Sequence, residues 1–154
     1  MKIKGKAKLQ CYKNGELKWD TGWGENIVVN DGIAEVVKLI GYGLSGARFR
    51  YLAVGTSDSE ALATQEALVA EITTGGLERA EATITQETDT ITGDTLKLEK
   101  SWTASDSHNV NEIGAFTAAS NGKMLGRKVL SETKSIVSGE ILKGIYEFTF
   151  ERSV

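Results

Sequence analysis

The sequence contains no proline, one cysteine and one histidine among its 154 residues. A single cysteine, Cys11, excludes a disulfide within the chain and any cysteine-rich metal site. A single histidine, His108, excludes a zinc site built on a pair of histidines. Because proline is absent, we expect the turns to be made by the 17 glycines and by asparagine and aspartate, which suits β-hairpins.

The chain also lacks a strong excess of charge of one sign and any long apolar run. Its formal net charge is -3, whereas nucleic-acid-binding proteins usually carry a marked basic excess, so we expect no nucleic-acid partner. The apolar runs are far too short to span a bilayer, and no apolar segment follows the charged first residues. We therefore expect no membrane partner and no secretory signal.

The rest of the composition is that of an ordinary globular protein. Hydrophobic residues make up 40% of the chain and charged residues 25%, which provides enough apolar material for a core and argues against disorder. No internal repeat, linker or low-complexity tract divides the sequence. We interpret residues 1–154 as a single β-rich domain.

The beginning of the chain predicts a β-hairpin over about residues 2–21. Polar residues, mostly lysines, alternate with apolar or small residues from Lys2 to Cys11, which is the period of two of a half-buried strand. Asn14-Gly15 then indicates the turn. The domain is therefore expected to open with this hairpin.

The register of the hairpin depends on the length of its loop. A two-residue loop would place Cys11 opposite Lys18 and so mix apolar and charged residues on one face. A three-residue loop removes this mismatch, because it pairs Cys11 with Leu17. The same loop pairs Leu9 with Trp19. We therefore expect the three-residue loop.

One segment predicts an α-helix. Apolar residues recur at helical spacing, at Ile33, Val36, Val37 and Ile40. We expect a helix over Asp31–Ile40 with this stripe facing the core. Asn30 or Asp31 is expected to cap its first amides, and Gly41 and Gly43 to end it.

The remainder of the chain predicts short strands separated by turn-rich stretches. Their expected ranges are 49–54, 77–87, 95–103, 110–118, 123–130 and 142–150. A short helical turn is expected within 61–72. Seven to nine short strands with one short helix indicate a mainly-β fold, an antiparallel β-sandwich or a flattened barrel.

No pattern in the sequence indicates catalysis. Cys11 falls on the apolar face of the first strand, where we expect it to fill core volume. His108 lies in the polar run 105–109, where we expect a solvated turn. The glycine-rich and acidic turns match neither a phosphate-binding loop nor a calcium loop. We expect no catalytic residue, no metal, no cofactor and no enzyme activity.

Four lysines form the first of three candidate surface features. Lys2, Lys4, Lys6 and Lys8 lie on one face of the first strand, and we call them the lysine row. The row fits a solvated, charged strand that discourages aggregation. The alternative is a contact with an acidic partner surface.

Two tryptophans and one pair of opposite charges are the other features. Trp19 and Trp23 lie four residues apart, and they fit either the core or an exposed interface anchor. Glu112 and Arg127 each lie within an apolar strand. We expect these two to form a partly buried structural ion pair.

Six short segments, taken in order, resemble small virion structural proteins of tailed bacteriophages and prophages. The segments are ENIVVNDG at 25–32, YLAVGT at 51–56, ALVAEI at 67–72, RAEAT at 79–83, NEIGAF at 111–116 and KMLGR at 123–127. The resemblance covers most of residues 25–150, although the chain lacks the proline common after Gly55-Thr56 in such proteins. It implies a non-enzymatic, β-rich component of the virion that is made in the host cytoplasm.

The resemblance leaves the place of the protein in the particle open. We favour a capsid decoration protein that binds and reinforces the shell, because the chain has no coiled coil, collagen-like repeat or receptor-binding extension. The alternative is a tail, neck or fibre component. A carbohydrate-binding β-sandwich module is the third hypothesis. The expected partners are other virion proteins, namely the major capsid protein or tail proteins, and further copies of the chain in a homo-oligomer.

Overall fold

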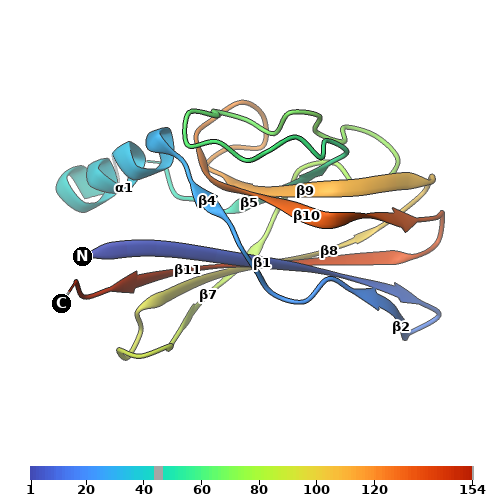
Figure 1. Ribbon diagram of the computed structural model, residues 1–154, viewed down its shortest axis with the longest axis horizontal. Coiled ribbons are helices and arrows are strands. Elements are labelled where there is room, and N and C mark those ends of the chain that lie inside the picture. Colours follow the sequence, from blue (N-terminus) through green and yellow to red (C-terminus); the bar gives the residue numbers. More distant parts are fainter. Residues whose placement is uncertain (44–46, 154) are drawn as a thin grey trace.

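The structure is a computed structural model that describes residues 1–43 and 47–153. Within these residues, one α-helix and eleven β-strands form two packed antiparallel sheets (Figure 1). The elements are β1 (Lys2–Lys13), β2 (Glu16–Asp20), β3 (Gly24–Glu25), β4 (Ile27–Val28), α1 (Asn30–Tyr42), β5 (Tyr51–Gly55), β6 (Ala80–Glu81), β7 (Thr83–Glu87), β8 (Thr95–Thr103), β9 (His108–Phe116), β10 (Met124–Ile136) and β11 (Ile141–Glu151). The expected mainly-β sandwich with one helix is confirmed, with more strands than expected.

The two sheets differ in the strands that they use. The hairpin sheet has the order β2-β1-β11-β8-β7, with β3 also pairing with β1. The other sheet has the order β4-β10-β9-β5-β6. We call this second one the roofed sheet, because the segment 56–79 passes over its outer face (green in Figure 1).

The main core lies between the sheets. The small or apolar residues of β1 point inward, and its lysines point outward, which confirms the alternation read from the sequence. Buried residues from both sheets form one cluster that includes Leu9, Cys11, Leu52, Leu98, Val110, Ile113, Leu125, Tyr146 and Phe148. Cys11 fills core volume as expected, and burial raises the pKa of its thiol.

The extra strands arise where the chain crosses from one sheet to the other. At Asn26 it passes from β3 in the hairpin sheet to β4 in the roofed sheet, and the Asn26 side chain donates a hydrogen bond to the buried hydroxyl of Tyr146. At Ala82 it passes from β6 to β7, again between the sheets. The sequence predicts one strand at 77–87, because only Ala82 separates β6 from β7. A break of one residue does not interrupt the strand pattern of the sequence.

The predicted hairpin register is wrong. The loop has two residues, Asn14 and Gly15, both with positive φ, and not three. A β-bulge between Cys11 and Tyr12 then shifts the pairing, so that Cys11 lies opposite Trp19. The bulge therefore keeps Lys18 from lying opposite Cys11, which the longer loop was expected to do.

Helix α1 lies within three residues of its expected bounds, but of its apolar stripe only Val36 faces the core as expected. Ile33, Val37 and Ile40 are exposed, whereas Gly32 and Glu35 are buried. Val36 and Leu39 pack against the core from the same side. The helix therefore presents a different face to the sheets from the one that apolar spacing indicates.

Close packing at Gly32 explains this orientation. A Cβ atom there would lie 2.6 Å from the carbonyl oxygen of Leu125 in β10, so only glycine allows this approach. The predicted side-chain cap is also wrong, because the capping residue is Val29 and makes no side-chain hydrogen bond. Asp31 instead pairs with Lys123 beyond the end of β9, at 2.8 Å. The helix ends at Gly43, as expected.

Candidate functional sites

A long irregular segment covers the outer face of the roofed sheet. This segment, residues 56–79, is called the roof here, and the helical turn expected within 61–72 is not found in it. The roof returns alongside β5, where the Ile72 amide donates to the Val54 carbonyl at 2.9 Å. A second apolar cluster lies beneath it and includes Ala53, Leu68, Phe116 and Met124. The roof thus has its own small core on the far side of the sheet.

The structure brings Glu112 and Arg127 together beneath the roof. Both side chains are fully buried, and the Arg127 Nε lies 2.6 Å from a carboxylate oxygen of Glu112. The Glu112 carboxylate also accepts hydrogen bonds from the backbone amides of Val69 and Ala70, at 3.2 and 2.8 Å. The pair is therefore more deeply buried than expected and is bonded to the roof as well as to itself.

Arg127 is hydrogen-bonded to the first part of the roof. Its Nη1 donates to the carbonyl oxygens of Ser59 and Glu60, at 2.9 and 3.1 Å. The same nitrogen donates to the side-chain oxygen of Gln65, at 3.2 Å. One ion pair between β9 and β10 thus binds the first part of the roof through Arg127 and a later part through Glu112. The roof itself has almost no regular hydrogen bonding.

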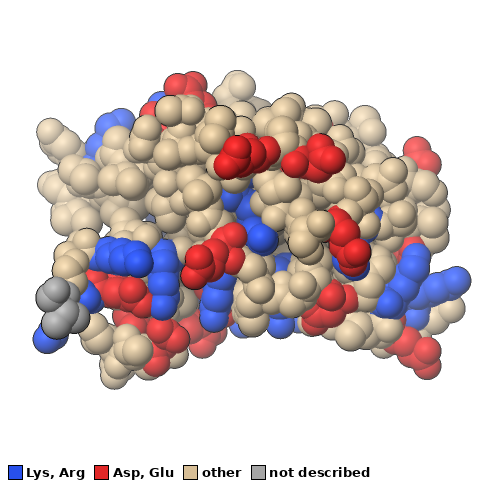
Figure 2. Space-filling view, in the orientation of Figure 1, with Lys and Arg blue, Asp and Glu red and all other residues tan. Residues whose placement is uncertain are grey.

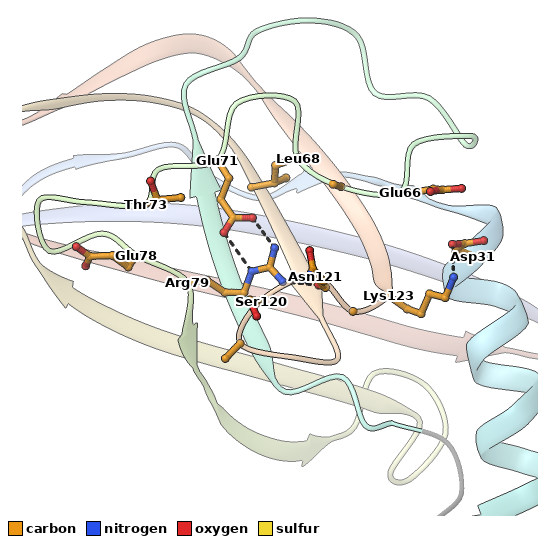
Figure 3. Close-up of a pocket in the computed structure, with 13 residues that line it drawn as sticks. Asp31, Glu66, Leu68, Glu71, Thr73, Glu78, Arg79, Ser120, Asn121 and Lys123 are labelled. Atoms are coloured by element: carbon orange, nitrogen blue, oxygen red, sulfur yellow. Dashed lines mark hydrogen bonds and ion pairs between the residues drawn. The ribbon is translucent and has the colours of Figure 1, made fainter.

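A polar cleft of about 640 Å³ opens at one end of the roof (Figure 3). It lies between the beginning of α1, the roof and the turn that connects β9 to β10. Arg79 and Glu71 form a two-point ion pair on one side, at 2.5 and 3.2 Å. Lys123 and Asp31 form the ion pair on the other side, which raises the pKa of Lys123.

Arg79 is the most constrained cation of the cleft. Its guanidinium lies over the Phe116 ring at 3.7 Å. It also donates to the carbonyl oxygens of Ala118 and Asn121, at 3.1 and 2.7 Å. Arg79 therefore joins the roof to the β9–β10 turn and has little freedom to meet a ligand.

The chemistry available in the cleft is hydrogen bonding and charge. Glu66, Thr73, Glu78 and Ser120 complete its polar lining. Across residues 1–43 and 47–153, no group of three or more histidine, cysteine, aspartate or glutamate side chains is placed to hold a metal ion. The sequence singled out one cleft residue, Asp31, and only as a candidate helix cap. It assigned no role to Arg79 or Lys123, although both lie in segments that carry the resemblance.

The lysine row lies on the open face of the hairpin sheet, where acidic groups of the neighbouring strand meet it. Lys4 pairs with Glu151, and Lys6 lies 3.3 Å from Glu147. Figure 2 shows side chains of both charges gathered over this sheet. The row is therefore part of a mixed-charge surface and not a purely basic patch.

The two tryptophans occupy different places. Trp23 is partly exposed, and its ring lies 4.6 Å from the ammonium of Lys6 and 4.7 Å from that of Lys8. Trp19 packs against the core and donates its ring N–H to the Ser135 carbonyl at 2.9 Å. The structure thus joins Trp23 to the lysine row and separates Trp19 from it.

His108 does not lie in a solvated turn, so that prediction is wrong. It is the first residue of β9, opposite Ile136, and is half buried. Its Nε2 is buried without a hydrogen-bond partner among the described residues. The polar run 105–109 hides this placement, because its last two residues already belong to the strand.

Among the described residues, no helix has the length and apolar character needed to cross a membrane. The family model described as "Podophage GP4 fiber I protein gp80" matches residues 44–146, about two thirds of the chain. The matched range includes the roof, the buried ion pair and most of the cleft. No curated protein matches the chain.

Proposed function

The chain belongs to the family of podophage GP4 fiber I protein gp80, and we propose that it is a structural component of the tail or fibre apparatus of a tailed-phage particle. The family makes it a phage virion structural protein. The observation that carries the proposal is the match over residues 44–146, which favours the tail, neck or fibre alternative over the capsid decoration protein preferred from the sequence.

We include in the proposal that the protein is not an enzyme. Cys11 is buried in the core, and His108 lies at the start of β9, outside the cleft lining. The cleft carboxylates of Asp31 and Glu71 are each held by a cation. These contacts suit a surface that positions partners more than one that activates a nucleophile or a water molecule.

The buried ion pair supports a role as a rigid building block. Glu112 and Arg127 fix a 24-residue roof (56–79) over the sheet without regular secondary structure. A rigid surface loses little conformational entropy when it docks. Apart from Leu68, the lining of the cleft is polar or small, and it includes no aromatic ring on which a sugar could stack, so no observation there favours a carbohydrate-binding module.

The location of the protein on the particle tests the proposal. Antibodies raised against the purified chain and labelled with gold would be imaged on intact particles, with particles assembled without its gene as the control. We expect gold at the tail or fibres. Gold distributed over the shell would overturn the proposal and restore the capsid decoration hypothesis. Binding of the purified chain to isolated tails, compared with protein-free shells, gives a second measurement.

A further inference from the structure

The positive charges of the lysine row are not compensated evenly along β1. Lys4 pairs with Glu151, and Lys6 lies 3.3 Å from Glu147. Lys8 forms no ion pair with any described residue. The part of the row that includes Lys8 therefore carries a positive charge that the described residues do not pair.

Two further carboxylates lie on strands beside Lys8 without pairing with it. Asp20 accepts hydrogen bonds from the side chain of Gln10 and the amide of Gly22, at 2.8 and 2.7 Å, and its charge reaches Lys8 only over a longer distance. Glu25 of β3 forms no ion pair with any described residue. A carboxylate from outside the chain can therefore approach Lys8 without displacing an existing partner.

A tryptophan brings two ammonium groups of the row together. The ammonium groups of Lys6 and Lys8 lie 4.6 and 4.7 Å from the centre of the Trp23 ring, within the range of cation–π attraction. Both lysines leave the same face of β1, so their ammonium groups meet on one side of the sheet. One anion placed there can contact both groups.

The chain holds the Trp23 ring from both sides. Before it, the Thr21 amide donates to the Leu9 carbonyl, and the Leu9 amide donates to the Thr21 hydroxyl, each at 3.0 Å. After it, β3 pairs with Lys6 and Ala7 of β1. Groups that are already fixed lose little conformational entropy when a ligand binds. The arrangement is therefore preformed.

A third lysine reaches the same place from the other sheet. Lys128 of β10 is half-buried and forms no ion pair with any described residue. A Cβ atom at Gly24, the residue after Trp23, would lie 2.7 Å from the Lys128 Nζ, so the ammonium group lies against the backbone of β3. We call Lys6, Lys8, Lys128 and Trp23 the cationic cluster. Lys128 joins it through folding alone, because it lies far from β1 in the sequence.

The chemistry of the cationic cluster favours a carboxylate-bearing protein as its ligand. Ammonium groups and carboxylates form charge-assisted hydrogen bonds, and a partly exposed tryptophan is typical of protein interfaces. Two ammonium groups already lie against the Trp23 ring, which leaves it less free to stack on a sugar. The net charge of -3 opposes the approach of a long polyanion such as nucleic acid.

We propose that the cationic cluster binds an acidic segment of another protein, whose carboxylates pair with Lys8 and Lys128. The proposal rests on this surface alone and not on the place of the protein in the virion. It can therefore fail while the tail or fibre assignment stands, and the reverse also holds.

The test measures binding of a fluorescently labelled oligoglutamate peptide to the purified full chain by fluorescence anisotropy. Wild type is compared with Lys8→Glu and with Lys2→Glu. Lys2 is the matched control, because it lies on the same face of β1, about 20 Å along the strand from Lys8. We expect Lys2→Glu to bind within about twofold of wild type and Lys8→Glu to bind at least about tenfold more weakly. Binding to wild type should weaken as salt is raised.

Two further variants test the place of Lys128 in the cluster. Lys128→Gln removes the charge, whereas Gly24→Ala keeps the charge and fills the space beside the ammonium group. Each should weaken binding of the peptide by about two- to fivefold. Wild-type affinity in both variants would show that Lys128 does not belong to the site.

Four outcomes would overturn the proposal. These are a wild type that does not bind the peptide, equal losses in Lys8→Glu and Lys2→Glu, tighter binding to polygalacturonate than to oligoglutamate, and an oligomeric state that changes in Lys8→Glu. The third would assign the surface to an acidic polysaccharide, and the fourth to a second copy of the chain. Thermal unfolding checks that each variant is folded. Lys8→Gln, with an expected loss of about two- to fivefold, replaces Lys8→Glu if the latter is not.

Discussion

The outer faces of the two sheets use the same chemistry in opposite surroundings. On the hairpin sheet, Lys143 lies 2.8 Å from Glu99 of the neighbouring strand, and both side chains are about one-third exposed. On the roofed sheet, Arg127 lies 2.6 Å from Glu112 of the neighbouring strand, and both are fully buried. The comparison shows that a cross-strand ion pair makes no fixed contribution to the free energy of unfolding. The contribution depends on whether other residues bury the pair.

Removal of the buried cation should have the largest effect. Arg127→Met leaves the Glu112 carboxylate buried without its cation, which should lower the free energy of unfolding by about 3–5 kcal/mol. The free energy would be measured by urea denaturation. Lys143→Met is the matched control on the open sheet. Equal losses in the two variants would remove the distinction between the faces.

Replacement of both members of the buried pair should have an intermediate effect. Glu112→Met with Arg127→Met leaves neither charge of the pair, but the amides of Val69 and Ala70 lose their acceptor, at a cost of about 1–3 kcal/mol. The double variant should thus be more stable than Arg127→Met. Hydrogen exchange should be faster at Val69 and Ala70 than in wild type. Unchanged exchange would show that the roof keeps its conformation without the ion pair.

The exposed pair should have a small effect that salt removes. Lys143→Met should cost about 0.2–1 kcal/mol at low ionic strength. The difference from wild type should shrink as salt is raised, because exposed charges are screened. The unfolding free energies would be compared in a series of salt concentrations. A loss that persists in high salt would mean that Lys143 acts through packing.

The pH dependence of the same pair should be the smallest effect. The hydrogen bond from Lys143 lowers the pKa of Glu99 from its usual 4.5. Stability from this carboxylate is therefore present above the unfolded pKa and is lost as pH falls through the lower, folded pKa. NMR titration of Glu99 should show a higher pKa in Lys143→Met than in wild type. An unchanged value would assign the shift to another group.

Local sequence patterns predicted those parts of the fold that depend on residues close together in the sequence. The alternation of β1 and the bounds of α1 follow from spacing along the sequence, and both are confirmed. The orientation of α1 could not be read in the same way, since it depends on the contact of Gly32 with the backbone of Leu125 in a distant strand. The crossing at Asn26 is likewise set by both sheets at once.

The candidate sites follow the same division. The pairing of Glu112 with Arg127 could be anticipated, because a charge within an apolar strand needs a partner. Their bonds to the roof could not, because the roof offers backbone amides and carbonyls that carry no residue-specific signal. The cleft is assembled from three segments far apart in the chain, so no local pattern marks it.

The pairing of the first strand with the last has a consequence for the chain during its synthesis. Lys2 lies opposite Glu151, and Ile3 opposite Phe150, so one edge of β1 stays open until β11 has left the ribosome. Such distant pairing slows folding and exposes apolar strands to aggregation. Until β11 is synthesised, Lys4 and Lys6 lack the carboxylates of Glu151 and Glu147. The charge of the row should then keep nascent chains apart, and pairing with β11 brings carboxylates to Lys4 and Lys6 once the fold is complete.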